Sequence, residues 1–178
     1  MFIKLIAIIS TIQQFAAIAE FPNGTETRMN FFSCNPADAI NVSSIELFDQ
    51  NNLPMYPIRL EDLATIKLKS YNNGDVIKRD EANVEIYAYV EKDGIWIWEN
   101  IIPEPFRFLL HNIDGCKMAH NCPLMKGDLD LALSIDLYKY AIFFGFVDKK
   151  LAHQFIVKLY DAENHQEVSC ETIQFKLI

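Results

Sequence analysis

The chain has 178 residues, of which 51% are hydrophobic, 12% aromatic and only 22% charged, with just 6 Gly and 7 Pro. This composition excludes disordered, collagen-like and low-complexity classes and fits one compact domain. The formal net charge is -8 and no basic run occurs, so we expect no nucleic-acid partner, because the main electrostatic attraction to phosphates is missing.

The first 19 residues have the order of regions that is typical of a secretory signal peptide. Lys4 precedes the apolar stretch Leu5–Ile12, and the small-residue pattern Ala17-Ile18-Ala19 follows. A membrane anchor needs about 20 apolar residues, whereas this stretch is shorter and is followed by two glutamines. We expect cleavage before Glu20 and one domain over residues 20–178, with 159 residues and a charge of -9. The protein is then secreted.

In an exported protein the four cysteines predict two disulfides rather than a metal site. They are Cys34, Cys116, Cys122 and Cys170, and three pairings are arithmetically possible. The short spacing of Cys116 and Cys122 favours a bond between them. Cys34 and Cys170 then remain as the second pair, which would bring the two ends of the mature chain side by side.

Two N-glycosylation sequons fit the same compartment. They are Asn23-Gly24-Thr25 and Asn41-Val42-Ser43. Both asparagines are therefore predicted to lie at the surface and to carry glycans, and the first, in a polar tail, is the stronger candidate.

Alternation of apolar and polar residues with a period of two dominates the mature chain and predicts strands. It is clearest over 84–90 and 129–137, where Val84, Ile86 and Leu131 belong to the apolar faces. Less regular strands are predicted over 40–48, 63–70, 95–101, 153–160 and 171–177. About seven strands at this spacing predict an all-β, immunoglobulin-like sandwich of two antiparallel sheets. The segment 105–111 is either a single helical turn or another strand.

The residues that carry chemistry give no catalytic pattern. The four histidines, His111, His120, His153 and His165, have no zinc-binding spacing. There is no nucleophile elbow, no redox cysteine pair and no glycine-rich phosphate loop. Strand alternation places the carboxylates Asp128, Asp130 and Asp136 on a solvated face. We therefore expect no enzyme, no metal and no cofactor.

Two apolar blocks exceed what strand alternation requires. Over 95–98, Trp96 and Trp98 share one face and two isoleucines the other. The second block, 138–147, lies where a polar connection is expected and contains Phe143, Phe144 and Phe146. Such residues form buried core strands, contact a protein partner, or face lipid, and the sequence leaves these alternatives open.

The order of these features resembles the MD-2-related lipid-recognition family of secreted β-sandwich lipid binders. The resemblance covers the mature chain from Phe31-Phe32-Ser33-Cys34 onward, and its most specific element is the C-x5-C-P loop from Cys116 to Pro123. It implies disulfides Cys34–Cys170 and Cys116–Cys122. The segments 91–97 and 38–45 are similar to the ganglioside GM2 activator branch, although the additional cysteine pairs of that branch are missing.

The resemblance implies an apolar cavity between the sheets that holds the acyl chains of a glycosphingolipid, a sterol or a phospholipid. The implied functions are to present or carry this lipid, in contact with membranes and with a lysosomal hydrolase, in the extracellular space or in the endosomal or lysosomal lumen. A sterol carrier, an immune lipid sensor and a solid-core sandwich that binds a protein are the alternatives. The residues expected at the cavity or its rim are Val84, Ile86, Trp96, Trp98, Leu131, Leu133, Phe143, Phe144, Phe146, Phe155 and Val157.

Overall fold

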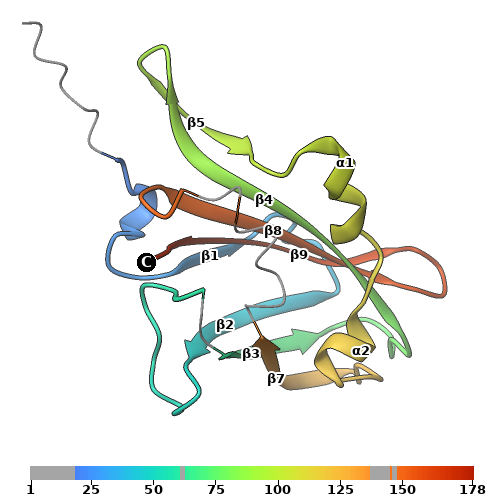
Figure 1. The fold of residues 1–178 in the computed structure, drawn as a ribbon. Helices are drawn as coiled ribbons and strands as arrows, with labels where there is room; N and C mark the ends of the chain where they lie inside the picture. Colours follow the sequence, from blue (N-terminus) through green and yellow to red (C-terminus); the bar gives the residue numbers. More distant parts are fainter. Residues whose placement is uncertain (1–18, 61–62, 137–144, 146–147) are drawn as a thin grey trace, which may run out of the picture.

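The computed structural model describes residues 19–60, 63–136, 145 and 148–178. Two antiparallel sheets face each other as the two layers of an all-β sandwich (Figure 1). The elements in chain order are η1 (Pro22–Gly24), β1 (Asn30–Ser33), β2 (Ile40–Phe48), β3 (Leu63–Asn72), β4 (Asp80–Lys92), β5 (Ile95–Asn100), α1 (Glu104–Arg107), η2 (Phe108–Leu110), β6 (Ile113–Asp114), α2 (Gly115–Ala119), β7 (Gly127–Asp136), β8 (Ala152–Asp161) and β9 (Glu167–Lys176).

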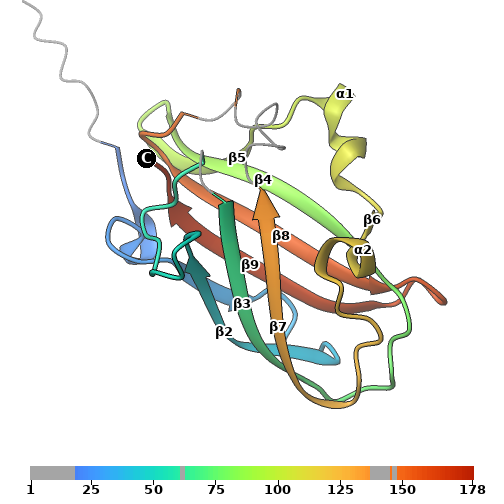
Figure 2. The same ribbon diagram turned by 60° about the horizontal axis from the view of Figure 1, so that its bottom comes forward.

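The larger sheet has the strand order β1-β9-β8-β4-β5, with the short strand β6 also paired to β4. The smaller sheet has the order β2-β3-β7. In Figure 2 the smaller sheet lies across the larger one, and the α1–η2 segment lies beyond the β4 side of the larger sheet. The chain therefore changes sheets several times, and strands that are distant in sequence become neighbours.

The strands predicted from alternation are all present within the described residues, and β2 has the predicted bounds 40–48. The segment 105–111 takes its helical alternative, as α1 followed by η2. The prediction missed β1, β6 and α2, because strands of four and two residues and a helix of five residues are too short to show a period.

The disulfides are Cys34–Cys170 and Cys116–Cys122, as predicted. The first joins the end of β1 to β9, and these two strands pair from Asn30 opposite Gln174 to Ser33 opposite Glu171. The start of the domain therefore lies along its last strand. In the loop-closure model this cross-link stabilises the fold by roughly 5 kcal/mol, against about 2 kcal/mol for the short loop.

The buried apolar core is divided into three clusters rather than forming one continuous layer. The first joins both sheets and contains Ile40, Ile77, Leu124, Leu129 and Val168. The second attaches the α1–η2 segment to β4 through Ile86, Ile102 and Leu110. The third covers the end of β9 with Leu60, Phe175 and Leu177. Of these three clusters, only the first contains buried residues from strands of both sheets.

Among the described residues, no helix has the length and apolar character needed to cross a membrane. The longest helix there is α2, with five residues.

Candidate functional site

The four residues predicted to line a cavity from the larger sheet share one face of it. Val84 pairs with Val157, and Ile86 pairs with Phe155, across β4 and β8. Directly paired residues point to the same side of a sheet. Ile86 is buried, whereas the other three are only half-buried. The structure therefore brings these four residues together on one face of the larger sheet, and their role in lining a lipid cavity stays a prediction.

The smaller sheet presents a similar face. Leu131 and Leu133 of β7 pair with Leu68 and Ile66 of β3, and all four side chains are half-buried. The alternating neighbour Ala132 is exposed. The apolar faces of both sheets thus keep accessible surface, whereas a sandwich with a solid core would bury them completely.

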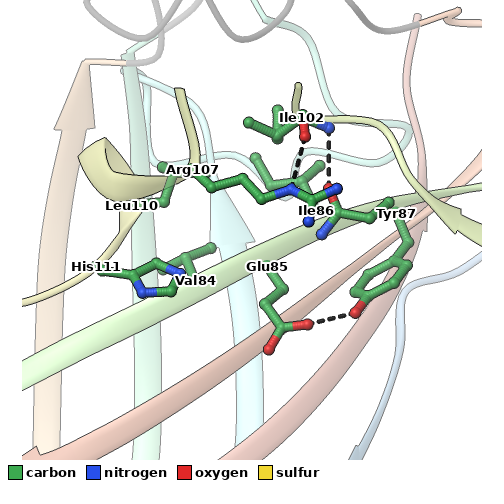
Figure 3. Close-up of a pocket in the computed structure, with 9 residues that line it drawn as sticks. Val84, Glu85, Ile86, Tyr87, Ile102, Arg107, Leu110 and His111 are labelled. Carbon is green, nitrogen blue, oxygen red and sulfur yellow. Dashed lines mark hydrogen bonds between the residues drawn. The ribbon is translucent and has the colours of Figure 1, made fainter. Parts of the chain in front are cut away.

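A pocket of about 310 Å³ opens beside β4, between the place where β5 ends and the place where β6 begins (Figure 3). Its volume is at the lower end of the range of about 300–1,000 Å³ that is typical of ligand pockets. Its apolar wall is formed by Val84, Ile86, Ile102 and Leu110, and its polar edge by Glu85, Tyr87, Asn100, Arg107 and His111. It thus combines predicted cavity residues with polar groups from three other segments.

The polar edge is held in place by local hydrogen bonds. The side chain of Arg107 extends across the pocket toward Ile102 (Figure 3), and its Nε donates to the Ile102 carbonyl at 2.9 Å. A second guanidinium nitrogen donates to Glu104 at 2.5 Å. The Tyr87 hydroxyl donates a hydrogen bond to the Glu85 carboxylate. Burial is the main cause that raises the pKa of Tyr87, and the negative charge of Glu85 adds to it. The pocket therefore offers an ordered set of donors and acceptors beside an apolar wall.

Large apolar side chains are exposed along β5 and η2, the two elements that precede and follow α1 in the chain. The exposed fractions are 65% for Ile95, 41% for Ile97, 68% for Phe108 and 47% for Leu109. We refer to these four residues as the apolar edge.

The structure shows what the two tryptophans of β5 contact among the described residues. Trp96 and Trp98 stack against Tyr89, with ring centroids 5.4 Å and 4.9 Å apart. Tyr89 is on the face of β4 opposite to Ile86, because three positions separate them and strand faces alternate. The isoleucines of β5 are on the same side as Ile86, because Ile97 pairs with Val90 of β4. Lipid contact by the tryptophans stays a prediction.

The predicted rim residues Phe143, Phe144 and Phe146 lie outside the described residues. The glycosylation sites are described, but their occupancy stays a prediction. Asn23 is exposed and its Nδ2 donates to Gln174 at 2.7 Å, whereas Asn41 is half-buried.

One group of potential metal ligands occurs among the described residues, and its chemistry does not suit a metal ion. It consists of Asp80, Cys116 and Cys122. The two cysteines are joined in a disulfide, so they offer no thiolate. Oδ1 of Asp80 lies 3.0 Å from each sulfur atom, and a Cβ at Gly115 would lie 2.5 Å from Oδ2. The group is a tightly packed structural support for the C-x5-C loop.

The sequence analysis did not identify the polar edge of the pocket or two buried titratable residues, His153 and Glu171. Glu85 and Tyr87 looked like ordinary solvent-facing strand residues, and Arg107 is brought to them only by the turn at α1. His153 is 0% exposed and neither ring nitrogen has a hydrogen-bond partner, so burial lowers its pKa to about 4. The alternating pattern around His153 predicts a strand, but it does not indicate whether a histidine in that strand is buried or exposed.

Several solved structures resemble the chain, and one of them is chicken MD-1 in its complex with lipid IVa. It matches at 12% identity and a TM-score of 0.34, covering 89% of this chain and 94% of that chain. No family model and no curated protein matches the chain. At this TM-score the two structures do not superpose closely as wholes, and the description of the fold rests on the strand pairing given above.

Proposed function

We propose that this protein is a secreted, non-catalytic lipid-binding sandwich of the MD-2-related lipid-recognition type. One observation carries the proposal: several apolar side chains on the facing sides of the two sheets remain half-buried where a solid core would bury them, namely Val84, Leu131, Leu133, Phe155 and Val157. Covering such surface with lipid tails contributes roughly 0.8 kcal/mol for each buried methylene group. Acyl chains are therefore the occupants that this interior fits best.

The pocket beside β4 supports a ligand with a polar head. Its wall is continuous with the cavity face through Val84 and Ile86, while Glu85, Asn100 and Arg107 form its edge. Carboxylate and amide oxygens accept hydrogen bonds from sugar hydroxyls, and a guanidinium pairs with a carboxylate. A glycosphingolipid with an acidic sugar fits these groups, in the manner of the ganglioside GM2 activator branch. Presentation of that lipid to a soluble lysosomal hydrolase completes the proposal.

Lipid exchange requires contact with a membrane, and the apolar edge is the described surface that suits it. The block 142–147, of which only Gly145 is among the described residues, is proposed to act with it as a lid that enters the bilayer. The mature charge of -9 repels anionic membranes at neutral pH. Carboxylates begin to protonate near their model values of about 4, so we expect tighter vesicle binding near pH 5 than near pH 7, as suits an endosomal or lysosomal lumen.

Binding of a nitrobenzoxadiazole-labelled ceramide tests the proposal. Replacing Leu133 by Asn places a polar group on the cavity face, and the affinity should fall roughly tenfold, because about 1.4 kcal/mol or more of apolar contact is lost. Ala132→Asn is the matched control on the exposed side of the same strand, and it should bind like the wild type.

Equal affinities of the Leu133 and Ala132 variants, or no binding by the wild type, would contradict the proposal. The second result would favour the solid-core sandwich that binds a protein. Competition by unlabelled ganglioside, sterol and phospholipid then ranks the ligand classes, and displacement by sterol alone would favour the sterol carrier over the activator.

A further inference from the structure

Two buried carboxylates lie where the two sheets meet along one side of the sandwich. Here β2 of the smaller sheet contacts β9 and β1 of the larger one, and we refer to this contact as the closed seam, formed by Ser33, Asp38, Val42 and Glu171. Glu171 is 6% exposed and Asp38 is 9% exposed. Neither oxygen of Glu171 has a hydrogen-bond partner, and Oδ2 of Asp38 has none either.

The direction of Glu171 follows from its register. It pairs with Val157 of β8, which is on the cavity face, and with Ser33 of β1. Its carboxylate therefore points between the sheets, toward β2. The Val42 backbone N–H lies near the carboxylate and partly offsets the rise of its pKa, although it completes no hydrogen bond with either oxygen.

Within the part of the chain that the structure describes, the charge that acts on Glu171 is negative. The negative charge of Asp38, in the turn before β2, raises the pKa of Glu171. The negative charge of Glu167 in β9 likewise raises the pKa of Asp38. Asp38 accepts a hydrogen bond from Asn35 at 2.5 Å, which is a neutral partner. Val157 from β8 carries no charge. Among the described residues, no basic side chain forms an ion pair with Asp38 or Glu171.

Burial, with a smaller contribution from Asp38, raises the pKa of Glu171 to about 7. The group is therefore protonated in an acidic compartment and ionised above neutral pH. Ionisation places an uncompensated charge between the sheets beside a second carboxylate, which is expensive in a medium of low polarity. The structure can relieve that cost by admitting water, which requires β2 and β9 to move apart.

We propose that Glu171 and Asp38 form a proton-controlled latch that holds the closed seam shut at acidic pH and loosens it at neutral pH. The latch rests on the proposed function, because it regulates retention of lipid in the space between the same two sheets. Bound lipid is held tightly when Glu171 carries its proton, and it is released faster when the proton leaves.

The test follows the release of labelled ceramide from the loaded protein into excess unlabelled phosphatidylcholine vesicles, at about pH 6 and about pH 8. The ionised fraction of Glu171 rises from about one tenth to about nine tenths over this range, so the wild-type release rate should rise on the order of tenfold. Glu171→Gln keeps the side chain neutral and should release slowly at both pH values. Glu46→Gln removes an exposed carboxylate from β2 and should behave like the wild type.

Asp38→Asn gives an independent check, because it should shift the pH at which release changes. A purely structural role of Asp38 would not cause such a shift. Removing its negative charge lowers the pKa of Glu171, so the midpoint of the release profile should move to lower pH. Release that does not depend on pH in the wild type, or that keeps its full pH dependence in Glu171→Gln, would overturn the latch while leaving lipid binding intact. Failure of the wild type to bind the ceramide at either pH would instead overturn the proposed function, and the latch with it.

Discussion

The two long sides of the sandwich show opposite relations between chemistry and burial. At the closed seam, Asp38 and Glu171 are buried without adequate partners. At the β4–β5 side, Ile95 and Phe108 are exposed at 65% and 68%. A fold selected for stability alone would reverse both, since unpaired carboxylates favour water and large apolar groups favour the core. This contrast is the basis of the two proposed roles: control of the contact between the sheets on one side, and contact with lipid on the other.

The seam side depends first on its covalent link, and removing that link gives the largest expected effect. Replacing Cys34 and Cys170 by Ser should lower the free energy of unfolding by up to about 5 kcal/mol, against about 2 kcal/mol for Ser at Cys116 and Cys122. Chemical denaturation of the two double variants measures both values. An equal loss in both would show that the seam is not the more dependent side.

The buried groups His153 and Glu171 should shape the pH dependence of stability with opposite signs. The pKa of Glu171 is about 7 in the folded protein, above its ordinary value of 4.5. The stability that protonated Glu171 contributes to the fold is therefore lost as the pH rises from 4.5 to 7. The folded-state pKa of His153, about 4, is below its model value of 6.5, so its contribution is lost as the pH falls from 6.5 to 4. Each is worth about 3 kcal/mol, and they cancel over most of this range.

Single variants separate these two contributions. With Glu171→Gln, the free energy of unfolding should rise by about 3 kcal/mol between pH 4 and pH 6.5, and with His153→Leu it should fall by about 3 kcal/mol between pH 4.5 and pH 7. Urea denaturation across pH measures both slopes. Parallel profiles for the two variants would show that the groups are not buried as described.

The apolar edge should give the smallest effect on stability and a large one on membrane contact. Replacing Phe108 and Leu109 by Ser should change the free energy of unfolding by no more than about 0.5 kcal/mol, because both side chains are exposed. Binding to phosphatidylcholine vesicles should fall by roughly tenfold or more. Phe32→Ser, at a side chain 45% exposed on β1, is the control and should bind vesicles normally.

Strand alternation predicted the sandwich well because its signal is local. Leu129, Leu131 and Leu133 follow each other on one face at the predicted period, and their neighbours are exposed. The predicted cavity residues of β4 and β8 lie side by side because the two strands pair in regular register, with Val84 opposite Val157 and Ile86 opposite Phe155. Local pattern therefore specified which faces are apolar.

The same pattern does not show which face of a strand points to the interior of the sandwich, or which segments lie opposite that face. Trp96 and Ile97 alternate as predicted, but only the pairing with β4 shows that Ile97 is on the side of Ile86. The pocket edge and the seam combine segments that are far apart in the sequence. Glu171 meets Asp38 across 133 positions, and this burial arises from tertiary packing alone.

The central claim is that lipid occupies the space between the sheets. Native mass spectrometry of the secreted full-length protein, followed by extraction and identification of any bound molecule, tests it most directly. The account predicts a mass increment equal to one amphiphile with acyl chains, which is lost or reduced in Leu133→Asn and retained in Ala132→Asn. A protein that carries no lipid after secretion, and takes up none from ganglioside-containing vesicles at about pH 5, would contradict the account.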